Sequence, residues 1–123
     1  MDDAPIQYEK ADYSAILAKD SRYDRRAYDF VLEVMERAME ESKGRQVSGR
    51  FVLDAFRDLA LDLYGPMAYA VMSDWGVRSC EDVGNIVFNL YDAKMIGKSD
   101  SDSRDDFFDG FDFKEEFLGP YAV

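Results

Sequence analysis

Apolar and polar positions alternate with a helical period over most of this chain. The clearest case is residues 49–64, where apolar side chains fill roughly half of the helical circumference and charged side chains fill the opposite arc. Ser48, a favourable N-cap residue, comes directly before this segment. The pattern predicts an amphipathic helix over residues 49–64. Phe51 and Leu61 fall inside the charged arc, so either neighbouring elements cover them or they form a small exposed patch for a partner.

Two helices are expected before this central one. Asp24 is a suitable N-cap for a helix over residues 25–43, whose apolar side chains form one stripe, and Gly44 is expected to end it. A shorter helix is expected just after Asp12, and residues 1–10 are expected to form a loose lead.

Two further helices are expected after the central one. A Gly-Pro pair at positions 65–66 predicts a tight corner, followed by a short buried helix over residues 66–75. The segment 79–93 opens with Ser and, three residues later, Asp, which is the spacing of a capping box. Gly84 lies in the middle of this helix and costs roughly 1 kcal/mol relative to Ala. A close approach by another part of the chain would justify this glycine.

The C-terminal segment 99–116 has a different character, because acidic and aromatic residues alternate in it. Its short apolar stretches on either side of a polar turn favour a small β-hairpin slightly, and the alternative is an aromatic strap packed against the helices. The fold class predicted for residues 1–123 is therefore mainly α: a compact single domain of four or five helices. A C-terminal hairpin would make it winged-helix-like.

Charge narrows the classes of partner. The chain carries 26 acidic and 15 basic residues, a net charge of −11, and residues 99–116 alone contain eight acidic and two basic residues. Such a chain repels nucleic-acid phosphate and anionic membranes, and it attracts cations and basic protein surfaces. We therefore expect a basic protein partner, no direct nucleic-acid binding and no membrane association. The acidic N-terminus resembles no export signal, and the single cysteine agrees with a cytoplasmic location.

The candidate contact residues come from three places: the acidic C-terminal run, the polar face of the helix over 79–93, and the basic residues of the central helix. They are Asp100, Asp102, Asp105, Asp106, Asn85, Asn89, Arg50 and Arg57. An EF-hand starting at the first of these aspartates fails, because its sixth and twelfth positions hold Asp105 and Phe111. Internal ion pairs with the surplus carboxylates are the alternative role for the two arginines.

Catalytic chemistry has little support. The chain contains no histidine, which removes the commonest nucleophile–base pairs and zinc sets, and Cys80 is expected to be an ordinary packed residue. No phosphate-binding glycine loop is present, and we expect neither a cofactor nor a structural metal.

Several segments together resemble the Minf family, an uncharacterised bacterial family of short acidic proteins. They are SRYDRRAYDFV, VSGR, YGPMA, DWGVRSCEDVGNIVFNL, DSRDDF and FDFKEEF. Members often carry a histidine just before the Val-Ser/Thr-Gly segment, where this chain has Gln46, so the resemblance implies no imidazole chemistry here. It implies a single domain and a bacterial cytoplasmic location, and it implies no activity.

The leading hypothesis is a non-catalytic acidic module that binds a basic protein surface. The alternatives are a small carboxylate- or cation-dependent enzyme with its site in a helical cleft, and a diverged winged-helix regulator. A concave pocket with converging carboxylates that have perturbed pKa values would favour the enzyme, and a real hairpin with nearby basic surface would favour the regulator.

Overall fold

The computed structural model describes residues 12–43, 47–96, 105–108 and 110–121, and these ranges contain helices and no strand. The expected loose lead, Asp100, Asp102 and Gln46 lie outside them. The α-helices are α1 (Ser14–Lys19), α2 (Arg25–Ser42), α3 (Gly49–Tyr64), α4 (Ala68–Asp74), α5 (Cys80–Asp92), α6 (Asp105–Phe108) and α7 (Phe113–Leu118). Two short 3₁₀ turns, Gly65–Met67 and Gly119–Tyr121, follow α3 and α7. The mainly α prediction is confirmed.

The three long helices begin at the caps that the sequence predicts. The side chains of Asp24, Ser48 and Ser79 accept hydrogen bonds from backbone amides in the first turns of α2, α3 and α5. The sequence predicts that α2 ends at residue 43, just before Gly44. The helix instead ends at Ser42, and Lys43 takes the left-handed conformation, with a φ of 55°, that often follows a helix. Local capping therefore sets where the main helices start.

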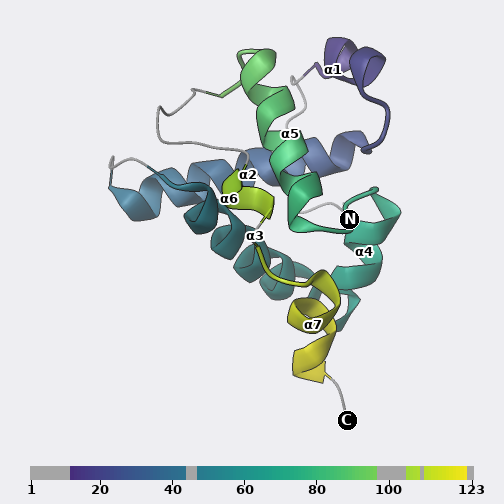
Figure 1. Ribbon diagram of the computed structural model, residues 1–123, viewed down its shortest axis with the longest axis vertical. Helices are drawn as coiled ribbons and strands as arrows, with labels where there is room; N and C mark the ends of the chain where they lie inside the picture. Colours follow the sequence, from purple (N-terminus) through teal and green to yellow (C-terminus); the bar gives the residue numbers. More distant parts are fainter. Residues whose placement is uncertain (1–11, 44–46, 97–104, 109, 122–123) are drawn as a thin grey trace, which may run out of the picture.

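The core forms where α2 packs against α3 and α5 (Figure 1). Rings of Phe30, Phe56, Tyr64 and Trp75 contact one another there, with Phe30 and Phe56 in an edge-to-face arrangement at 5.1 Å between centroids. Trp75 is thus a core anchor. Phe51 and Leu61 are partly buried against the same core, as expected if neighbouring elements cover them.

The segment after α3 is less buried than the sequence predicts. The chain turns at Gly65, whose φ is 50°, and α4 follows after one 3₁₀ turn. Within α4 only Ala68 and Met72 are buried, and Met67 just before it is 60% exposed. The expectation of a short buried helix is therefore only partly met: Tyr69 and Val71 are partly buried, and α4 lies at the edge of the helices (Figure 1).

The hairpin prediction for the C-terminal segment is wrong over the residues that are described there, which form α6 and α7. Asp112 caps α7 by accepting from the amide of Glu115, and Phe113 and Phe117 then bury one helical face. The rings of Phe111, Phe113 and Phe117 contact one another, and the last two also contact Phe56. The described residues therefore match the aromatic strap, built from helices.

Two glycines let α6 reach the core. A Cβ on Gly84 would lie 2.8 Å from Phe107 Cβ, and a Cβ on Gly49 would lie 2.6 Å from Asp106 Cβ. Phe107 is buried in this position between α3 and α5. The mid-helix glycine of α5 is thus explained by a close approach, as the sequence suggests.

Candidate functional site

Asn85, one of the predicted contact residues on α5, is hydrogen-bonded inside the protein. Its side-chain amide donates to the Tyr23 hydroxyl at 3.0 Å, and this hydroxyl donates to Asp82 Oδ1 at 2.6 Å. Burial, with the hydrogen bond to Asp82, raises the pKa of Tyr23 well above its ordinary value. Asn85 therefore ties α5 to the connection between α1 and α2.

Asn89, the second predicted residue on α5, is held in the same way. Its side-chain nitrogen donates to Asp20 Oδ2 at 2.9 Å and to the Tyr28 hydroxyl at 3.1 Å, which uses both amide hydrogens. Arg22 donates twice to the Asp20 carboxylate, and this pairing holds the Asp20 pKa well below its ordinary value. The part of the polar face of α5 that carries Asn85 and Asn89 is thus covered, whereas Glu81 and Asp92 on the same helix are exposed. We call this part the covered face; its two asparagines stabilise the fold.

The predicted basic residues on α3 take part in internal ion pairs. Arg50 lies 3.9 Å from Asp54, and Arg57 lies 3.7 Å from the same carboxylate. Arg57 also pairs with Asp58 and with Glu116 of α7, each at 3.1 Å. Arg57 therefore fastens α7 to α3, which favours the structural interpretation of these arginines.

The acidic C-terminal run is described only in part. Asp105 begins α6, and Asp106 is partly buried where α6 meets the first turn of α3. A carboxylate near a helix N-terminus is favourable, because it opposes the positive end of the helix dipole. Asp106 therefore lies beside the start of α3, next to Gly49, whereas Asn85 and Asn89 are hydrogen-bonded to Tyr23 and Tyr28.

Cys80 is packed rather than reactive. It is buried, its thiol donates to the backbone carbonyl of Phe111 at 3.3 Å, and burial raises its pKa to about 11. The thiol is therefore protonated at neutral pH, and the protonated form is a poor nucleophile.

A groove between α2 and α3 gathers acidic residues that the sequence did not single out for binding. It has a volume of about 300 Å³ and is lined by Arg37, Glu41, Ala55, Asp58, Leu59 and Asp62. We call it the α2–α3 groove. Arg37 is engaged by Glu33 of its own helix at 2.8 Å. In the sequence, residues 37 and 41 and residues 58 and 62 are charged pairs spaced i,i+4, so each pair shares one side of its helix. The sequence does not show that the two pairs line the same groove.

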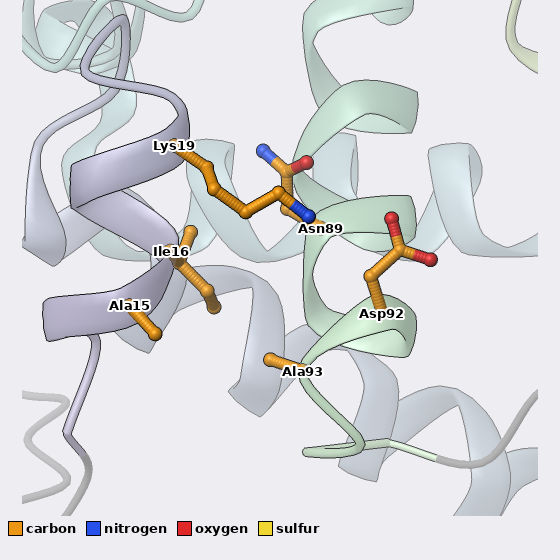
Figure 2. Close-up of a pocket in the computed structure, with 6 residues that line it drawn as sticks. All are labelled: Ala15, Ile16, Lys19, Asn89, Asp92 and Ala93. Atoms are coloured by element: carbon orange, nitrogen blue, oxygen red, sulfur yellow. The ribbon is translucent and has the colours of Figure 1, made fainter.

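A second hollow lies between α1 and α5 (Figure 2). It is smaller, about 120 Å³, and its walls are mostly apolar. The residues that line it are Ala15, Ile16, Lys19, Asn89, Asp92 and Ala93. We call it the α1–α5 hollow. Asn89, one of the predicted contact residues, lines this hollow.

Among the described residues, no group of three or more Asp, Glu or Cys side chains is arranged to hold a metal ion. In the same part of the chain, no helix combines the length and the apolar character needed to cross a lipid bilayer. Comparisons with protein-family models, with curated proteins and with solved structures gave no match.

Proposed function

We propose that this protein is a non-catalytic interaction module that binds a Lys- or Arg-rich segment of a basic protein in the α2–α3 groove. The observation that carries the proposal is the convergence of Glu41, Asp58 and Asp62 from two helices on one groove, against the single cation of Arg37. A groove lined in this way offers charge complementarity to a basic segment.

The internal ion pairs leave part of this negative charge available. Arg37 is engaged by Glu33, and Asp58 by Arg57. Glu41 and Asp62 are exposed and form no ion pair with any described residue. These two carboxylates are therefore the best placed to accept the charged ends of a partner.

The floor of the groove suits long basic side chains. It contains Leu59, which is buried, and Ala55, which is partly buried. Lys and Arg lay their aliphatic stems on apolar surface and keep their charged ends among polar groups. The groove offers both parts of this contact, which a purely acidic surface does not.

The overall charge supports association with the same class of partner. A net charge of −11, more than half of it within residues 99–116, attracts basic proteins over several ångströms and speeds encounter at low salt. We include Asp100, Asp102, Asp105 and Asp106 in the proposal as a source of this long-range attraction.

The two alternatives have less support. A carboxylate enzyme would use the same groove, but its three carboxylates, Glu41, Asp58 and Asp62, are all exposed, so the groove does not shield them from water. A winged-helix regulator needs a wing, and the described residues of the C-terminal segment are helical. Membership of the Minf family and a bacterial cytoplasmic location remain expectations from sequence.

The experiment that tests the proposal is capture from nuclease-treated lysate of the source organism, with the tagged full-length protein as bait. We expect one stoichiometric basic protein that stays bound at low salt and leaves at high salt, because the contact is largely electrostatic. The double variant Glu41→Lys/Asp62→Lys should lose most of the captured partner.

The matched control is Asp74→Lys/Asp92→Lys, which changes the net charge equally at exposed positions outside the groove, in the last turns of α4 and α5 where a cation suits the helix dipole. It should retain most of the partner, and both variants should unfold at temperatures close to that of the wild type. A bait that captures nothing would contradict the proposal. Equal loss in the two double variants would show that charge alone, and not the groove, determines binding.

A further inference from the structure

We propose that the α1–α5 hollow binds a small zwitterion with an aliphatic side chain, that is, a free aliphatic α-amino acid. The hollow has apolar walls and carries opposite charges on its two sides, Lys19 from α1 and Asp92 from α5 (Figure 2). This inference does not depend on the proposed basic partner, because the two sites share no residue.

The size of the hollow suits one short side chain. Its volume is about 120 Å³. For comparison, an apolar cavity of about 150 Å³ holds a benzene molecule. The apolar part of the lining consists of Ala15, Ile16 and Ala93, so the hollow has room for a branched aliphatic group and no room for a large aromatic one.

The two charged residues are available for a ligand. Lys19 and Asp92 are both exposed, and neither forms an ion pair with a described residue. Figure 2 shows the Lys19 side chain extending from α1 toward α5. A ligand carboxylate would bind the Lys19 ammonium group, and a ligand ammonium group would bind the Asp92 carboxylate.

Asn89 places a hydrogen-bond acceptor on the α5 side of the hollow, where Asp92 also lies. Its two amide hydrogens are already donated to Asp20 and Tyr28, so the oxygen Oδ1 is the atom of this side chain that a ligand can use. An oxygen acceptor next to a carboxylate favours an ammonium group over an anion. The net charge of −11 also disfavours a simple anion, whereas a zwitterion has no net charge to be repelled.

Two of the residues that line the hollow, Ile16 and Asn89, are held in place before any ligand arrives. The Tyr13 hydroxyl, at the start of α1, donates to the buried carboxylate of Asp29 at 2.6 Å and so docks α1 on α2. Ile16 is 5% exposed, and Asn89 is held by its two hydrogen bonds. A preformed hollow binds a small ligand without the entropic cost of ordering its walls.

The test is a titration of the ¹⁵N-labelled full-length protein with L-leucine, followed by amide chemical shifts. We expect saturable shifts confined to residues 15–19 and 89–93, with a dissociation constant in the millimolar range. 4-Methylpentanoate lacks the ammonium group and 3-methylbutylamine lacks the carboxylate, so each should bind at least about tenfold more weakly. Glycine, which has no side chain for the hollow, should also bind more weakly.

Single substitutions test the contributions of the charged residues and of the apolar walls to binding separately. Lys19→Gln and Asp92→Asn should each weaken L-leucine binding at least about tenfold, whereas the matched control Lys114→Gln on α7 should not change it. Ala15→Leu fills the hollow from an exposed helical position that tolerates Leu, so it should abolish binding and preserve the fold.

Three results would overturn the inference. They are shifts that do not saturate, binding of 4-methylpentanoate or 3-methylbutylamine as tight as that of L-leucine, and L-leucine binding that Lys19→Gln and Asp92→Asn leave unchanged.

Discussion

The polar face of α5 and the polar flank of α3 look alike in the sequence and have different roles in the structure. On α5, Asn85 and Asn89 are hydrogen-bonded to Tyr23 and Tyr28, about sixty residues earlier in the chain. On α3, Asp62 forms no ion pair with a described residue and lines an open groove with residues of α2.

The difference shows that helical polarity alone does not identify a binding surface. Polar residues opposite an apolar stripe mark a face that avoids the core. Whether that face meets solvent or another segment depends on tertiary partners. Here the connection between α1 and α2 crosses α5 and carries Asp20 and Tyr23 with it, while no described segment covers the α2–α3 groove.

The largest expected effect comes from dislodging the segment that covers α5. Gly76 has a φ of 90°, and a Cβ there would clash with the backbone carbonyl oxygen of Arg22. Gly76→Ala should lower the free energy of unfolding by roughly 2 to 4 kcal/mol, because it combines a left-handed alanine with a backbone clash. Urea unfolding measures this. Gly119→Ala, which meets nothing within 4 Å, is the control, and equal effects in the two variants would contradict the account.

A smaller effect is expected from breaking the hydrogen bonds on the covered face. Asn89→Ala leaves Asp20 and Tyr28 without a shared donor, and it should cost about 1 to 3 kcal/mol of stability. Urea unfolding is again the measurement. A change near zero would mean that water replaces the asparagine and that the α5 face is effectively open.

The Asp20 carboxylate predicts how the stability of the covered face depends on pH. Its pKa is lowered in the folded protein, first by Arg22 and then by Asn89, so the stabilisation is present above the unfolded-state pKa of about 3.9 and is lost as the pH falls below it. The difference in unfolding free energy between wild type and Asp20→Asn should therefore be largest near neutral pH and shrink in acid. A constant difference from neutral pH to about pH 2 would contradict this cause.

The smallest expected effect on stability comes from a substitution of Asp62, on the side of α3 that lines the α2–α3 groove. Asp62→Asn should change the free energy of unfolding by no more than about 0.5 kcal/mol, because Asp62 is exposed and forms no ion pair with a described residue. The same variant should measurably weaken capture of the basic partner. A large loss of stability would show that Asp62 has a structural role, as the α5 asparagines do.

The main helices could be predicted because the signals that set them are local. Asp24, Ser48 and Ser79 cap helices whose apolar stripes repeat with a helical period, and Gly65 marks a corner. The same reasoning was wrong for the C-terminal segment. There, short aromatic stretches fit a strand and a helix equally well, and the outcome depends on Phe107 fitting against Gly84.

The candidate site was harder to predict, for a physical reason. The sequence shows the charge of Asp58 and Asp62, but the facing position of Glu41 depends on how α2 packs against α3. It shows the polarity of Asn85 and Asn89, but Tyr23 and Tyr28 reach them only through the tertiary fold. Composition leads to the expectation of a basic partner, and packing determines which carboxylates are exposed in the groove.

The central claim is that the partner binds the open groove and leaves the covered face alone. The most direct test is an amide chemical-shift map of the full-length protein titrated with the captured partner. We predict saturable shifts at the groove residues Glu41, Ala55, Asp58 and Asp62, and none at Asn85. Shifts centred on the polar face of α5, with the groove unaffected, would contradict the claim.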